Sequence, residues 1–254
     1  MRGYLAFLKK ELMESTRTYK VFLMLVIFAV FGMMSPLIAK LTPQLIGSVV
    51  SAQMASAIPT PTAVDSWTQF YKNVAQMGLV ILVIVFSGVL ANELTKGTLV
   101  NVVTKGLSRA LVIAAKLTSM ALIWTVSLAL AFAMAWIYTS YLFGADELPH
   151  LGVAVLLLWI FGLFVLSLLM CAASLSTNNY MILLITGAVL VIGLLAGILP
   201  PAYHYNPLSL ASQNMPLITG AITLSDIGPA IAITVALTAG LVTGAILIFR
   251  RRLL

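Results

Sequence analysis

The chain has 254 residues, of which 61% are hydrophobic and only 8% are charged, and its formal net charge is +7 at pH 7. Soluble domains carry about 25% charged residues, so this composition excludes a soluble globular protein, which would have too few polar side chains to cover its surface. In a soluble protein the positive excess would suggest nucleic acid; here we expect it to set the topology of membrane helices, with no nucleic-acid partner.

The first 20 residues (1–20) predict a helix that lies on the inner membrane surface. Leucines recur at helical spacing on one side, while Lys10, Glu14 and Arg17 fall on the other side, where cations can approach anionic headgroups. A charged tail before the first span is the alternative, and we expect no cleaved signal peptide. The residues expected at the membrane interface are Leu5, Leu8, Lys9, Lys10 and Leu12.

Six apolar runs are long enough to cross a bilayer, which requires about 20 residues of helix. They are residues 21–38, 74–90, 107–143, 151–175, 181–199 and 227–249. The third run exceeds one crossing, so its first turns should project inward and place Lys116 at the membrane boundary. The sequence therefore predicts an all-α polytopic membrane protein, with one transmembrane domain over residues 1–254.

The distribution of lysine and arginine predicts that both termini lie inside. With the amino terminus inside, twelve of the fourteen cationic residues fall in inner segments, and only Lys40 and Lys72 fall in outer segments.

The long outer loop, residues 39–73, contains two helix signals. Thr42–Pro43 can begin a helix, and Ser66 with Gln69 forms a possible capping box that opens the second span. Three aromatic residues near that start suit an aromatic belt at the outer interface: Trp67, Phe70 and Tyr71.

The last outer loop, residues 200–226, is partly apolar but is divided by prolines into pieces too short to span. We expect it to re-enter the membrane under cover of other helices, with an ordinary surface loop as the alternative. In the fifth and sixth spans, Gly193 with Gly197 and Gly240 with Gly244 give the small-residue spacing that permits close helix packing.

Residues 91–106 form the charged inner loop between the second and third spans. Within it, Leu99, Val102 and Val103 recur at helical spacing, which suggests a short amphipathic helix that docks something outside the membrane. A loop that only fixes topology is the alternative.

Several kinds of chemistry are missing from the sequence. No Gly-Lys dipeptide occurs, so the chain has no P-loop, and no ionisable residue falls in the middle of a span, as coupled carriers usually require. The two histidines have no metal-ligand spacing, and no nucleophile lies beside a base. We therefore expect no enzyme, no metal and no cofactor in this chain. If the chain moves a substrate, we expect the energy to come from a separate ATPase that docks at the charged inner loop. The main alternative is an ATP-independent channel or carrier, and a scaffold or enzyme is the lesser one.

The arrangement resembles the permease subunit of type-2 ABC exporters, in the branch with a separate ATPase. The likeness rests on the amino-terminal helix, six spans, Glu93 with Gly97–Leu99 after the second span, and Ser108–Arg109 with Lys116 at the third. It covers nearly the whole chain.

The resemblance implies roles for these segments. The amino-terminal helix would be the elbow helix, and residues 93–104 would form the cytoplasmic coupling helix. The docking residues it implies are Glu93, Lys96, Gly97, Thr98, Leu99, Val102, Val103 and Thr104. The implied partners are two P-loop ATPase copies carrying Mg-ATP, a second permease copy and membrane lipid, in the plasma membrane of a bacterium or archaeon. The implied substrate is a drug, peptide or lipid.

Overall fold

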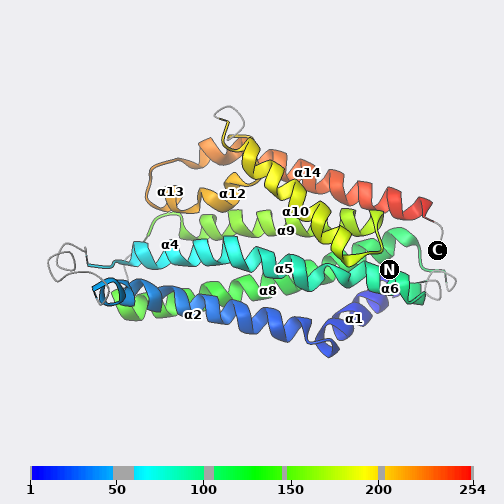
Figure 1. Cartoon of the computed structure of the whole chain (residues 1–254), viewed down its shortest axis with the longest axis horizontal. Coiled ribbons are helices and arrows are strands. Elements are labelled where there is room, and N and C mark those ends of the chain that lie inside the picture. Colours follow the sequence, from blue (N-terminus) through cyan, green and yellow to red (C-terminus); the bar gives the residue numbers. More distant parts are fainter. Residues whose placement is uncertain (1, 48–59, 100–105, 145–147, 200–203, 253–254) are drawn as a thin grey trace.

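The computed structural model describes residues 2–47, 60–99, 106–144, 148–199 and 204–252. Within these ranges the chain is helical, without strands, and its long helices run along one axis as a bundle (Figure 1), which confirms the predicted all-α fold. The elements in chain order are α1 Arg2–Arg17, α2 Lys20–Gly47, α4 Ala63–Asn73, η1 Val74–Gly78, α5 Leu79–Phe86, α6 Gly88–Thr95, α8 Arg109–Phe143, α9 Leu151–Leu175, α10 Asn179–Ala196, α12 Ser209–Ser212, α13 Asn214–Ile218 and α14 Leu224–Arg251.

Six helical stretches in the described ranges are long and apolar enough to cross a membrane, which confirms the predicted number of spans. They are Lys20–Leu45, Ala63–Thr95, Arg109–Phe143, Leu151–Leu175, Asn179–Ala196 and Leu224–Arg251. At the start of three of the long helices, a side chain caps a backbone amide by a hydrogen bond. Ser108 accepts a hydrogen bond from the Leu111 amide (3.3 Å), and Asn178 accepts one from the Tyr180 amide (2.9 Å). Asp226 binds the Thr223 amide (2.8 Å) in a capping box.

The second span begins earlier than the apolar run at 74–90 indicated. Its capping box is formed by Thr62 and Asp65, not by Ser66 and Gln69; the Asp65 carboxylate accepts hydrogen bonds from the Thr62 amide (2.8 Å) and hydroxyl (2.9 Å). The extra turns carry polar residues, but one side of α4 is buried. Ser66 on that side shares a 2.6 Å hydrogen bond with Thr139 of α8.

The predicted aromatic belt is also corrected. The three aromatic residues of α4 are 2%, 0% and 3% exposed: Trp67, Phe70 and Tyr71. They pack against one another and against Phe132 of α8, where ring centroids lie 5.3 Å (Trp67) and 6.5 Å (Phe70) away. These rings lie in the core and not at an interface with lipid headgroups, because burying their large apolar surfaces against other side chains is strongly stabilising.

Helix α2 continues through both of its prolines, so the expectation that Thr42–Pro43 begins a new helix is wrong. A proline removes one backbone donor. Here the residue before each proline adds a hydroxyl donor to the preceding turn: Ser35 donates to Phe31 O and Thr42 to Ile38 O, both at 2.6 Å. Such bonds, within an apolar environment, help a helix tolerate proline.

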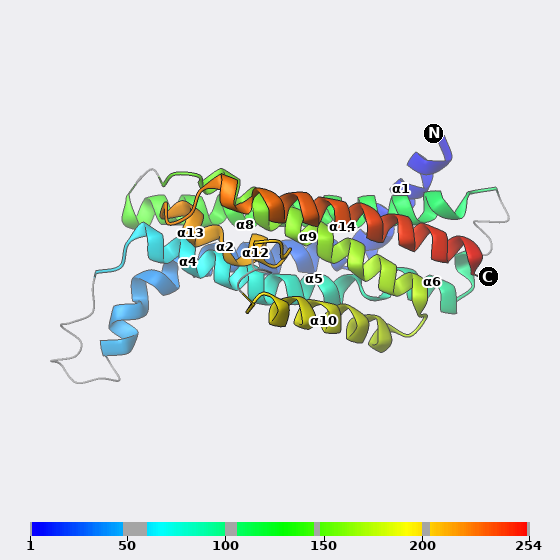
Figure 2. The same ribbon diagram turned by 90° about the horizontal axis from the view of Figure 1, so that it is seen from above.

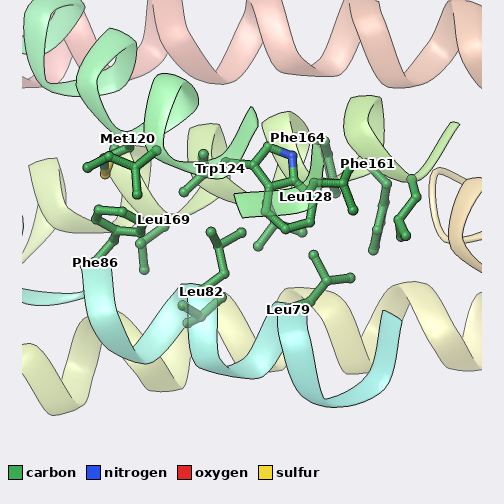
Figure 3. Packing of buried hydrophobic residues seen from close by; sticks show 14 of the residues in the cluster. Leu79, Leu82, Phe86, Met120, Trp124, Leu128, Phe161, Phe164 and Leu169 are labelled. Carbon is green, nitrogen blue, oxygen red and sulfur yellow. The ribbon is translucent and has the colours of Figure 1, made fainter. Parts of the chain in front are cut away.

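Helix α9 is the central helix, with α14 along one side of it, while α2 lies along α8. Figure 3 shows the core between α5, α8 and α9, where Leu82 and Phe86 point toward Trp124 and Leu169. The Trp124 indole donates to the Trp159 carbonyl at 3.2 Å, which satisfies its only polar group.

The short helices α12 and α13 fold back against α9 instead of running over the surface. Leu210, Leu217 and Ile218 are buried there. The Gly193–Gly197 pair makes room for this segment, because added Cβ atoms would meet Leu208 (2.9 Å) and Asn206 (2.8 Å). The pair therefore packs the returning chain and not a second long helix. An added Cβ at Gly240 would meet nothing within 4 Å, so no other helix among the described residues packs closely at that position.

Candidate functional site

Five charged residues meet where α1, α6 and α8 converge, near the end of the bundle that holds both chain ends (Figure 1). We call this group the charged junction: Lys10, Glu11 and Glu14 of α1, Glu93 of α6 and Lys116 of α8. Lys116 Nζ lies 2.9 Å from Glu11 Oε2 and 2.7 Å from Glu93 Oε2. Lys10 Nζ lies 3.0 Å from Glu11 Oε1 and 2.6 Å from Glu14 Oε2, and it also contacts Glu93 Oε1. Three helices are thus joined by ion pairs.

Three members of the junction are almost fully buried: Lys116 is 1% exposed, Glu11 3% and Glu93 7%. A buried charge is costly unless it is paired. Lys116 makes hydrogen bonds to both oxygens of Glu11, at 3.0 and 2.9 Å. Glu93 Oε2 accepts no well-aligned hydrogen bond, so its contact with Lys116 is mainly electrostatic. The Phe7 ring adds cation–π contacts, with Lys10 and Lys116 Nζ atoms 5.2 and 5.8 Å from its centroid.

The ion pairs shift the protonation equilibria of two α1 residues. Burial alone would lower the pKa of Lys10, but hydrogen bonds to Glu14 and Glu93 and the nearby charge of Glu11 raise it above the ordinary value of 10.5. Burial would raise the pKa of Glu14, but the hydrogen bond from Lys10 and the positive charges of Lys10, Lys116 and Lys20 together lower it below the ordinary 4.5.

The carboxylates of Glu11, Glu14 and Glu93 offer oxygens that lie within 4.8 Å of one another, a spacing that could hold a metal ion. However, the Lys10 ammonium contacts an oxygen of each of these three residues. An ammonium group has three donors and a single positive charge, so Lys10 supplies the cation that the carboxylates require.

The sequence contained a weak signal for this junction. Three of the seven acidic residues lie in the segments expected inside: Glu11, Glu14 and Glu93. The positive charge of those segments explains the topology but gives no reason for carboxylates there. Lys116, which we placed at the membrane boundary, is a buried counter-ion. Lys10, which we placed toward lipid headgroups, turns to carboxylates of its own chain.

The other interfacial residues of α1 have mixed exposure. Leu5 is 62% exposed, Leu8 and Leu12 are half-buried, and Lys9 is exposed. The side of α1 that packs on the bundle carries Phe7 and Glu11. Leu5 therefore remains available for a membrane interface.

The expected docking residues separate into three groups. Glu93 and Leu99 are buried, with Leu99 1% exposed, whereas Lys96, Gly97 and Thr98 are exposed. Gly97 ends α6 with a φ of 66°, a left-handed conformation that favours glycine. The remaining three residues lie outside the described part of the chain: Val102, Val103 and Thr104.

A second junction holds α8, α9 and α14 together at the same end of the bundle. Arg109 donates to the carbonyl oxygens of Arg250 (3.0 Å) and Arg252, and Arg252 donates to Ser174 O (2.9 Å). A cation at the end of a helix satisfies carbonyls that lack intrahelical partners. From the sequence, these arginines indicated the topology, and Arg109 also supported the family resemblance, but this contact was not predicted.

An apolar cleft of about 970 Å³ lies between the second span and α10, and reaches the segment around α12 and α13. Residues of both α5 and α10 line the cleft, and Figure 2 shows the two helices beside each other. Its walls include Leu79, Val83, Phe161, Leu190 and Leu208. The second span changes to a π-helix at η1, whose Ala75 and Gln76 line the cleft. A π-helical turn is rare and is often found at functional sites.

A family model described as "ABC-2 family transporter protein" matches residues 5–252, which is nearly the whole chain. A search of curated proteins found no match to the chain. Proteins of this family are membrane components of ABC transporters that associate with an ATP-binding subunit and are generally not catalytic themselves. The family and the six apolar helices together indicate a multi-pass membrane protein with the role of a permease. The chain therefore belongs to the ABC-2 family of transporter proteins.

Proposed function

We propose that this chain is the permease subunit of an ATP-driven exporter for a hydrophobic or amphipathic substrate. Two copies would assemble with two copies of a separate P-loop ATPase that binds Mg-ATP, in the plasma membrane of a bacterium or archaeon. The end of the bundle with the charged junction would face the cytoplasm, and α1 would be the elbow helix.

One observation carries this proposal: the exposed segment Lys96–Thr98 directly follows a helix that is fixed to two others by buried charge. Lys96, Gly97 and Thr98 are accessible to a partner. Glu93, on the preceding turn of α6, contacts Lys10 of α1 and Lys116 of α8.

This connection supports a route for mechanical coupling. A displacement of Lys96–Thr98 by a closing ATPase would move Glu93. Because Glu93 and Glu11 share Lys116, the displacement would reach α8 and α1 together. Leu99, buried below the exposed residues, would keep the segment anchored to the core. Such coupling shifts the permease between two states only if the partner binds them with different affinity.

The apolar cleft supports a route for the substrate. It lies between the second and fifth spans, and we propose that these two spans line the path at the interface of a permease dimer. Many exposed apolar residues flank it, among them Val80 (56%), Ile84 (57%) and Val191 (57%), which suits contact with lipid, substrate or a second copy.

The docking role is tested by copurification of the ATP-binding subunit with permease variants. Lys96→Glu and Thr98→Glu change exposed residues, so the fold should remain intact and the yield of copurified subunit should fall. Leu99→Asp is less informative, because a buried charge would unfold the segment. Lys40→Glu, an exposed lysine at the opposite end of the bundle, is the matched control and should retain the partner. Full copurification with both variants would overturn the docking role. Transport by the wild-type chain without any ATP-binding subunit would instead support a channel or carrier.

A further inference from the structure

The apolar cleft is polar at one end only. On the second span, its lining residues recur four apart in the order Thr68, Lys72, Gln76, Val80 and Ile84. The first three are polar and the last two are apolar. The segment around α12 and α13, which contacts α4 in the bundle, adds further polar side chains to the lining: Asn206, Ser209, Ser212 and Asn214.

The π-helix explains how one row of residues lines so long a cleft. In an α-helix, residues four apart drift by about 40° per step, which would carry Ile84 away from the cleft that Thr68 faces. A π-helix has about 4.4 residues per turn, so η1 reduces this drift in the middle of the row. Twelve residues separate Lys72 from Ile84, which corresponds to about 18 Å of helix. That length suits an extended hydrocarbon chain.

The polar end has one sign of charge. Lys72 is the one charged residue among those that line the cleft in the described part of the chain. Ion pairs among the described residues do not include it. Lys40, the other lysine at this end, donates to Leu142 O (3.3 Å) near the end of α8 and does not line the cleft. Among the described residues, therefore, no carboxylate neutralises Lys72, and its charge can attract a ligand.

We propose that the cleft binds a single amphipathic molecule with an anionic head, such as a phosphate, at Lys72 and Gln76, and a hydrocarbon tail along Val80, Ile84 and Leu190. The volume of about 970 Å³ lies near the upper limit of ordinary ligand sites. This inference rests on the proposed transport function for the fate of the ligand, and it names the substrate class of that function.

The test uses the full chain with its ATP-binding subunit in nanodiscs of neutral phosphatidylcholine. Two photoactivatable probes share one long alkyl chain with a diazirine near its end; one has a phosphate head and the other a trimethylammonium head. After irradiation, labelled peptides are identified by mass spectrometry. The phosphate probe should label the stretches around Val80–Ile84 and Leu190 about three- to tenfold more than the ammonium probe, because the exposed Lys72 ammonium attracts one head and repels the other. This ratio corresponds to about 0.7–1.4 kcal/mol.

Two sets of variants separate the head site from the tail site. Lys72→Gln should abolish the preference for phosphate and Lys72→Glu should reverse it, whereas Lys40→Gln should leave it unchanged. Gly187→Leu should reduce labelling by both probes, since a side chain there enters open space in the cleft. Gly240→Leu also enters open space but lies outside the cleft, and it should change neither.

Equal labelling by both probes, or a phosphate preference insensitive to Lys72, would overturn the proposal. Failure of the wild-type chain to retain an ATP-binding subunit would sink the proposed function but leave the labelling pattern intact, so the two failures are distinguishable.

Discussion

Glu93 and Lys116 form a buried ion pair, with Glu93 Oε2 2.7 Å from Lys116 Nζ and the two residues only 7% and 1% exposed. Glu11 shares the same ammonium group, so a single lysine holds carboxylates from two other helices. The charged junction therefore links α1, α6 and α8 through one ammonium group.

Removing the shared cation should be strongly destabilising. Lys116→Ala leaves Glu11 and Glu93 buried without their main counter-ion, at a cost of about 3–5 kcal/mol. Thermal or denaturant unfolding in detergent measures this loss. Lys96→Ala, at an exposed position close by, should change stability by less than about 0.5 kcal/mol. Equal effects of the two variants would mean that the ion pair contributes little.

The Glu93–Lys116 contact should appear as coupling in a double-mutant cycle. Glu93→Gln, Lys116→Gln and the double variant should deviate from additivity by about 1–3 kcal/mol, since contacting groups in one network do not act independently. Pairing Glu93→Gln with Lys72→Gln, at a position outside the junction, gives the additive reference. Additivity within the junction would contradict the contact.

The fold at the level of helices could be predicted because it depends on local composition. Runs of about 20 apolar residues identified all six spans, and the fourth was predicted at residues 151–175, as the structure has it. Polar signals were less reliable. The capping box at Ser66 was wrong because the buried side of α4 extends the helix back to Thr62.

The charged junction could not be predicted, because it depends on how distant helices pack. Helical periodicity placed Lys10 opposite the leucine stripe, which is correct for an isolated helix. It could not indicate that this side would meet Glu93, whose position depends on where α6 lies. The aromatic residues of α4 could not be placed from the sequence for the same reason. Aromatic side chains are typical both of an interfacial belt and of a buried core, and only the packing of the helices decides which of the two they form.

The junction should give the permease a defined range of pH stability. The raised pKa of Lys10 contributes stability that is present below its unfolded value of 10.5 and is lost as the pH rises through the folded value. The lowered pKa of Glu14 contributes stability that is present above 4.5 and is lost as the pH falls through its folded value. The stability difference between wild type and Lys10→Met should therefore be constant between these limits and decrease outside them. A difference independent of pH at both extremes would contradict the assignment.

Close packing of α2 on α8 should make Gly32 intolerant of a side chain. A Cβ at Gly32 would overlap the backbone carbonyl of Ala131, which cannot rotate away. Gly32→Ala should destabilise the protein by about 1–3 kcal/mol, measured by thermal unfolding. Gly187→Ala, which enters open space in α10, should be neutral or slightly stabilising because alanine favours helix. A neutral Gly32→Ala would show that the two helices can move apart.

The most direct test of the account measures ATP hydrolysis by the reconstituted complex with Glu93→Gln in the permease. Because Glu93 is buried behind the exposed Lys96–Thr98 segment, the variant should still copurify with the ATP-binding subunit. It should nevertheless lose the change in hydrolysis rate that the wild-type permease imposes on that subunit, since the link from α6 to α1 and α8 is weakened. A variant that both binds the subunit and modulates its hydrolysis as the wild type does would contradict coupling through the charged junction.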